Sequence, residues 1–256
     1  LPAVEDRLDS LRARRHSYDV AYNPTPAMFR VKKGDIVAFS GESGSGPAHL
    51  HLEYRDPSGA FANPFLRGIA SADTVAPEIG DIVFVPLDRD SAVDGSPLPV
   101  RFDPERSDPP HLTGRVGVAA RIVDRSEPGG FDLGVFRAEL ALDGSVVFSK
   151  EYASIPVNGG RLGGLDFLAG WRYGNGGTLS AFFRREGNNL GILSGPGIPA
   201  TGPGVTPTHR SFRITVRDYA GNTMSRDAGA VFGDRPIITA CAFDSSGVLR
   251  IAGSYQ

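Results

Sequence analysis

Polar and apolar residues alternate along several short segments of this 256-residue chain, and this alternation predicts strands rather than helices. In residues 212–217 the apolar Phe212, Ile214 and Val216 alternate with polar residues, so they are expected to face a core while the polar residues face solvent. The other predicted strands are residues 82–85, 116–123, 135–142, 145–148 and 179–183. Short strands without helical periodicity in this half of the chain predict a two-sheet β-sandwich.

Turn residues and prolines mark where these segments end. Asp143 and Gly144 separate two predicted strands and predict a tight hairpin turn. The polar, proline-containing residues 73–77 predict a domain boundary. A new apolar run after residue 233 predicts a last hairpin. We therefore expect three parts: residues 1–73, a sandwich over residues 74–233, and the start of a further β module at residues 234–256.

The first part of the chain has a different pattern. Apolar residues at helical spacing among charged ones predict a short amphipathic helix over residues 3–15, and an apolar run predicts a strand at residues 36–39. Residues 49–55 alternate again, which places His49 and His51 on one face of a strand.

The spacing of these two histidines permits metal chemistry. At a rise of about 3.3 Å per residue, their Cα atoms are roughly 6–7 Å apart. One imidazole could then bind a metal ion while the other reaches a metal-bound water. A half-exposed strand that happens to carry two histidines is an equal alternative on spacing alone.

The segment around the histidines resembles the end of the zinc endopeptidase domains of the lysostaphin and LytM type, which cut peptidoglycan cross-bridges. The resemblance rests on a Gly/Ser-rich turn at residues 41–46, on His49-Leu50-His51-Leu52-Glu53, and on Asn63-Pro64 some ten residues later. It implies that His51 is a metal ligand for zinc and that His49 is catalytic. It further implies peptidoglycan peptides as partners and a periplasmic or extracellular location in the cell envelope.

The chain departs from that family in two places. Pro47 lies one position earlier than the family's proline, and the family's upstream His-x-x-x-Asp ligands and further catalytic histidine are missing before His49. A catalytic zinc needs about three protein ligands. We therefore expect the chain to begin just after those residues and to be inactive alone. Its enzyme status stays open: it is part of a zinc-dependent peptidoglycan endopeptidase, or a non-catalytic envelope binding or scaffold module built on a degenerate peptidase fold.

A second resemblance concerns residues 218–222. Their sequence, Asp-Tyr-Ala-Gly-Asn, is similar to the Asp-x-Ala-Gly-Asn close of bacterial immunoglobulin-like domains. The expected fold class is accordingly all-β, with a partial LytM-type antiparallel β unit followed by an immunoglobulin-like β-sandwich. Asp218 and Asn222 are expected to bond turn amides, with Gly221 at positive φ. A calcium site at these residues is the less favoured alternative.

The composition of the chain excludes some classes of partner. The chain has 27 Lys and Arg against 29 Asp and Glu, so no global field favours nucleic acid. Its single cysteine excludes an internal disulfide, and no apolar run reaches the roughly 20 residues of a membrane helix. We therefore expect no nucleic-acid partner and no membrane span in this stretch. The family resemblance, rather than composition, implies peptidoglycan peptides or an envelope protein as partners.

Overall fold

The computed structural model describes the chain except for residues 1, 26, 40–51, 70–71, 106, 128–129, 131, 169–178, 203, 234–235, 244–247 and 256. At residues 161, 236–243 and 250–255 it describes the backbone alone. The chain divides into two compact units, Leu1–Leu52 and Glu53–Gln256. The boundaries predicted at 73/74 and 233/234 fall inside the second unit, and the separate domains expected there stay a prediction.

The first unit contains α1, which spans Pro2–Arg15 and confirms the predicted helix. The apolar residues of α1 are at most half-buried. The strand predicted at residues 36–39 was wrong, because these residues form no strand and Phe39 is 89% exposed. A strand needs a partner for its backbone hydrogen bonds, and the described residues of this unit contain no other strand.

The second unit begins with a small antiparallel sheet. Its strands are β1 (Tyr54–Arg55), β2 (Phe61–Ala62) and β10 (Ser154–Ile155), in the order β1-β2-β10. The 3-10 helix η1 (Pro64–Arg67) follows β2. Of the strand predicted at 49–55, residues 52–55 are described; β1 confirms its last two residues, whereas residues 52 and 53 form no strand. Because β10 comes from the later part of the chain, this sheet attaches the segment after the histidines to the sandwich.

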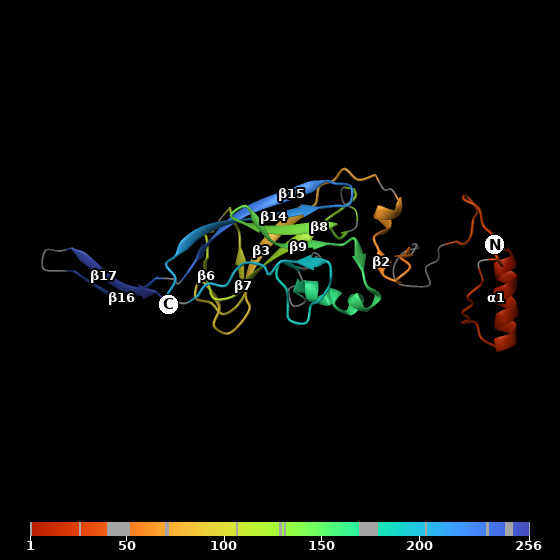
Figure 1. Ribbon diagram of the computed structural model, residues 1–256, viewed down its shortest axis with the longest axis horizontal. Helices are drawn as coiled ribbons and strands as arrows, with labels where there is room; N and C mark the ends of the chain where they lie inside the picture. The colour runs from red at the N-terminus through yellow and green to blue at the C-terminus, as the bar shows by residue number, and fades with distance from the viewer. Residues whose placement is uncertain are drawn as a thin grey trace. The chain divides into compact units, whose positions relative to one another are not determined.

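The rest of the unit is built on two larger sheets, and this confirms a mainly β fold (Figure 1). The five-stranded sheet has the order β11-β12-β7-β3-β5 and the seven-stranded sheet β13-β9-β8-β14-β15-β6-β4. The first consists of β11 (Phe167–Leu168), β12 (Leu179–Ala181), β7 (Val116–Val123), β3 (Glu78–Pro86) and β5 (Val100–Phe102). The second consists of β13 (Leu193–Ser194), β9 (Ser145–Glu151), β8 (Arg137–Leu142), β14 (Thr208–Arg217), β15 (Thr223–Phe232), β6 (His111–Thr113) and β4 (Ala92–Val93). Two short 3-10 helices, η2 (Val157–Arg161) and η3 (Gly163–Asp166), precede β11.

The two sheets share one apolar core. Phe84 of β3 meets Phe212 of β14 edge to face, with ring centroids 5.5 Å apart. Along β14 the apolar Phe212, Ile214 and Val216 are buried as predicted, whereas the arginines between and after them are exposed. The period-two pattern read from the sequence therefore gives the correct inward face of this strand.

Two hairpins follow the turn chemistry of the sequence. Asp143 and Gly144 both have positive φ (45° and 82°) in the two-residue turn between β8 and β9, which matches the right-handed twist of the paired strands. At the end of the chain β16 (Pro236–Phe243) pairs with β17 (Leu249–Tyr255), as expected from the last apolar run. Among the described residues, none of the helices has the length and apolar character that crossing a bilayer requires.

Candidate functional site

The two predicted site residues, His49 and His51, lie outside the described residues. The segment that follows them is described and is held against the sandwich. The Asn63 amide donates to the Ala153 carbonyl at 2.9 Å, and its side chain donates to the Tyr152 carbonyl at 3.3 Å. Two residues later, the Phe65 ring stacks on Tyr219 with centroids 3.8 Å apart and an interplanar angle of 10°. The Asn63-Pro64 element that closes the sequence motif is thus an attachment point.

A cavity of about 330 Å³ lies beneath this attachment. Asn63, Phe65 and Tyr219 line it, and so does Asp124, which follows β7. The cavity therefore connects the attached segment with an acidic group at the end of the sandwich.

That acidic group belongs to a cluster of three carboxylates. Asp73, Asp124 and Asp218 each offer an oxygen, and these oxygens all lie within 4.8 Å of one another. Asp124 and Asp218 are each only 1% exposed, and Asp73 is half-buried. Among the residues that the structure describes, this is the one group of three or more His, Cys, Asp or Glu side chains close enough to share a metal ion.

The fold brings these three residues together from distant parts of the sequence. Asp124 directly follows β7, and Asp218 directly follows β14. Asp73 precedes β3, whose first residue Glu78 pairs with Val123, the last residue of β7. Both sheets and the incoming segment thus contribute one carboxylate at the same end of the sandwich.

Asp124 has no hydrogen-bond partner for either carboxylate oxygen, and both oxygens are buried. Burial, with the neighbouring charges of Asp218 and Asp73, raises the pKa of Asp124 from 3.8 to about 6. The backbone amide of Arg125 has a smaller, opposite effect on the pKa of Asp124, although its geometry does not meet the criteria for a hydrogen bond to either carboxylate oxygen. In contrast, the Asp124 backbone is satisfied by the Leu133 backbone. The side chain alone lacks a partner.

The other two carboxylates are held in place by local hydrogen bonds. One Asp218 oxygen accepts from the Gly221 and Asn222 amides at 2.7 and 2.9 Å, and the other accepts from the Asn222 side chain at 2.7 Å. Gly221 has a φ of +98°. These observations confirm the expected structural role of Asp218 and Gly221. Asp73 accepts from the Val75 amide through Oδ1, and its Oδ2 is buried without a partner.

The arginines adjacent to this cluster in the sequence are occupied elsewhere. Arg125 pairs with Asp132 at 2.7 Å and with Glu78 at 3.3 Å. The Arg217 guanidinium lies over the Phe136 ring, 5.5 Å from its centroid. Neither arginine forms an ion pair with the cluster among the described contacts.

A second buried polar group surrounds Lys150. Its ammonium donates to Asp166 at 3.0 Å, to Ser180 at 2.6 Å and to the Ala181 carbonyl at 3.0 Å, and Tyr152 donates to the other Asp166 oxygen. Burial lowers the pKa of Lys150, and Asp166 opposes this change. All three N–H donors of the ammonium have acceptors. This arrangement stabilises the charged lysine as part of the core and leaves it no lone pair with which to activate Ser180.

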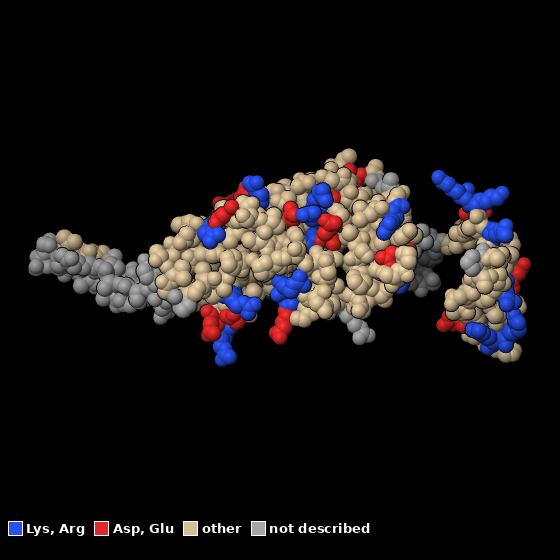
Figure 2. Space-filling model, viewed as in Figure 1, with Lys and Arg blue, Asp and Glu red and all other residues tan. Residues whose placement is uncertain are grey.

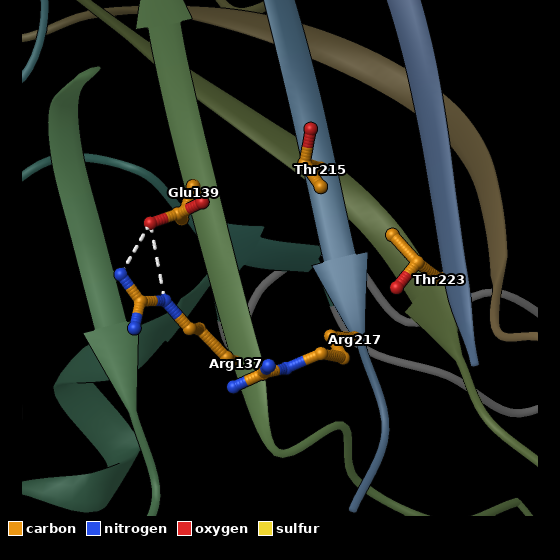
Figure 3. A pocket seen from close by; sticks show the side chains of 5 residues that line it. All are labelled: Arg137, Glu139, Thr215, Arg217 and Thr223. Atoms are coloured by element: carbon orange, nitrogen blue, oxygen red, sulfur yellow. Dashed lines mark hydrogen bonds and ion pairs between the residues drawn. The ribbon is translucent and has the colours of Figure 1, made fainter. Parts of the chain in front are cut away.

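The surface carries no comparable concentration of charge on the face seen in Figure 2, where acidic and basic side chains of the second unit are interspersed. A shallow depression of about 170 Å³ lies over β8, β14 and β15 (Figure 3). Arg137 in this depression pairs with Glu139 at 2.6 Å and with Glu151 at 3.0 Å. Because its guanidinium is already neutralised, we interpret this face as a solvated sheet surface.

Comparison of the chain with protein families, with curated proteins and with solved structures finds no match. The fold and the site define a β-sandwich protein with a buried acidic cluster at one end. Asp73, Asp124 and Lys150 were not identified from the sequence as site or network residues, because no local motif surrounds them. Asp218 was identified through its Asp-x-Ala-Gly-Asn turn.

Proposed function

We propose that residues 1–73 are the C-terminal part of the catalytic domain of a zinc-dependent peptidoglycan endopeptidase of the LytM type, and that an immunoglobulin-like β-sandwich follows it in this protein of the cell envelope. The observation that carries the proposal is the run His49-Leu50-His51-Leu52-Glu53 followed by Asn63-Pro64. The order of these residues and their strand alternation resemble the end of that peptidase domain.

The attachment of the following segment supports a positioning role for the sandwich. Asn63 and Phe65 lie 12 and 14 residues after His51 and contact Tyr152 and Tyr219 of the sandwich. The β2–β10 pairing adds backbone hydrogen bonds to the same attachment. Catalytic geometry depends on firm support of the reacting groups, and in this proposal the sandwich supplies such support through these contacts.

In the complete protein His51 would supply one of the zinc ligands. Bound zinc polarises a scissile carbonyl and makes its water more acidic. His49 would stabilise the attacking or departing oxygen by hydrogen bonding or proton transfer. The acidic cluster is a poor substitute for this zinc site, because it offers carboxylate oxygens alone and no nitrogen or sulfur ligand.

The test is hydrolysis of purified peptidoglycan by the full-length gene product. We expect release of cross-bridge peptides, its loss on treatment with a zinc chelator, and its recovery when zinc is restored. His51→Ala should abolish activity. His209→Ala is the matched control, because His209 is an exposed histidine on β14, and it should leave activity unchanged. A zinc-loaded, folded gene product without hydrolytic activity would contradict the proposal and leave the non-catalytic envelope module.

A further inference from the structure

We propose that Asp73, Asp124 and Asp218 form a calcium site that fastens the segment entering β3 to both sheets of the sandwich. The site is independent of the histidine motif, so it stands whether or not the peptidase proposal is correct. Its three ligands come from the residue after β7, the residue after β14 and the segment that leads into β3, and these lie together at one end of the sandwich.

The unpartnered side chain of Asp124 indicates a missing ligand. A buried carboxylate costs free energy unless hydrogen bonds or a cation compensate for it. Asp124 is 1% exposed, both of its oxygens lack partners, and the cluster places them near Asp73 Oδ2, which also lacks one. Three carboxylates without a described cationic partner form a natural site for a positive ion.

The donor set and its dimensions favour calcium. Calcium prefers oxygen ligands at about 2.3–2.6 Å, so two ligands on opposite sides of the ion are about 4.6–5.2 Å apart. The oxygens of the cluster lie within 4.8 Å of one another and fit that separation. Magnesium retains several waters and requires a near-ideal octahedron, which suits a site with two nearly fully buried carboxylates less well. Zinc favours nitrogen and sulfur ligands, which this cluster lacks.

Further oxygen ligands are available nearby. The cavity of about 330 Å³ beneath Asn63 and Phe65 reaches Asp124 and has room for water. Calcium takes six to eight oxygens, with waters commonly among them. Three carboxylates, some of them bidentate, and waters from this cavity would complete the coordination.

Calcium at this position would restrain the joint between the attached segment and the sandwich. The Asn222 side chain already links Asp218 to the Asp73 carbonyl, at 2.7 and 3.3 Å respectively. An ion shared by Asp73 and Asp218 would strengthen the same link and add β7 through Asp124. The site would therefore act on the segment that enters the sandwich rather than on a reaction.

The test is isothermal titration calorimetry of the whole chain, freed of metal, with calcium, magnesium and zinc chlorides in turn. We expect one calcium ion per chain, weaker magnesium binding, and an increase in the unfolding temperature with calcium. Asp124→Asn preserves the size of the side chain and should weaken calcium binding at least about tenfold, because ligand charge determines calcium affinity. Asp227→Asn removes an exposed carboxylate that pairs with Arg213 and should leave calcium binding unchanged.

Hydrogen exchange tests the restraint itself. Calcium should slow exchange at the Gly221 and Asn222 amides in the wild-type chain and have no such effect in Asp124→Asn. No calcium binding up to millimolar concentration by the folded wild-type chain would overturn the proposal. Calcium binding that is equally tight in Asp124→Asn, or Asp124-dependent binding of zinc in preference to calcium, would overturn it as well.

Discussion

Replacement of Asp124 by asparagine should stabilise the folded chain when calcium is absent, and calcium should reduce that stabilisation. Without a cation, the Asp124 carboxylate is buried next to two other carboxylates and has no hydrogen-bond partner. Asparagine has nearly the same shape, carries no charge, and its amide can donate to the carboxylates of Asp73 or Asp218. In chelator at pH 7, Asp124→Asn should therefore be more stable than the wild type.

The magnitude follows from the raised pKa. Burial and the neighbouring charges raise the pKa of Asp124 from 3.8 to about 6. Each pH unit between these values is worth about 1.4 kcal/mol, so ionised Asp124 destabilises the folded chain by up to about 3 kcal/mol above pH 6. The native state binds this proton more tightly than the unfolded state. The wild-type free energy of unfolding should therefore fall between about pH 4 and pH 6, and this contribution should be absent in Asp124→Asn.

Calcium should narrow the stability difference between the two proteins. At a concentration 1,000 times its Kd, a ligand that binds the folded state alone adds about 4 kcal/mol. The wild type should gain about that amount. In Asp124→Asn, calcium binding weakened at least about tenfold adds at most about 2.7 kcal/mol, so calcium should reduce the stability advantage of the variant by at least about 1.4 kcal/mol.

Urea denaturation followed by circular dichroism, at pH 7 with chelator or with calcium, measures both effects. Asp227→Asn is the control and should respond to calcium as the wild type does. The reasoning would be refuted if Asp124→Asn were less stable than the wild type in chelator, because the carboxylate would then make a favourable interaction without a metal.

Three further predictions concern the sandwich. Ile214→Ala should lower the free energy of unfolding by about 2–5 kcal/mol because Ile214 is fully buried, and a loss below about 0.5 kcal/mol in urea titration would contradict its core position. Lys150→Met leaves Asp166 buried without its cation and should cost about 3–5 kcal/mol; adding Asp166→Leu should recover part of this loss, and no recovery would exclude the unpaired charge as the cause. In Gly195→Ala the new Cβ would lie 2.2 Å from a carbonyl oxygen of β9, at a residue whose φ is +86°. The melting temperature of this variant should be well below that of Gly144→Ala, because Gly144 also has a positive φ but has open space around it. Equal melting temperatures of the two variants would refute the close approach at Gly195.

The strands of the sandwich were predictable because their information is local. β7 has the predicted bounds, 116–123, and the Asp143-Gly144 turn has the positive φ angles that its sequence requires. Alternation along β14 correctly identified its buried face. In each case the side chains of one short segment determine both its conformation and the face that becomes buried.

The predicted strand at 36–39 shows where local information fails. Its residues have high strand propensity, but the described part of that unit gives them no partner strand. Strand propensity reflects packing against neighbours as much as backbone preference. An apolar segment without a neighbouring strand therefore stays irregular.

The acidic cluster could not be predicted for a different reason. Asp73, Asp124 and Asp218 are separated by 51 and 94 positions in the sequence, and their convergence depends on how two sheets pack. The same holds for Lys150, whose partners Asp166 and Ser180 come from different elements. The local role of Asp218 in its turn was predictable, whereas its part in the cluster required the fold.

The central functional claim is the division of roles between the two histidines, and zinc content measures it most directly. The full-length gene product and its variants would be purified without added chelator, and zinc per chain would be determined by mass spectrometry. His51→Ala should lose the zinc, His49→Ala should retain most of it while losing peptidoglycan hydrolysis, and His209→Ala should match the wild type. Loss of zinc in His49→Ala with retention in His51→Ala, or a wild-type protein that holds no zinc, would contradict the account.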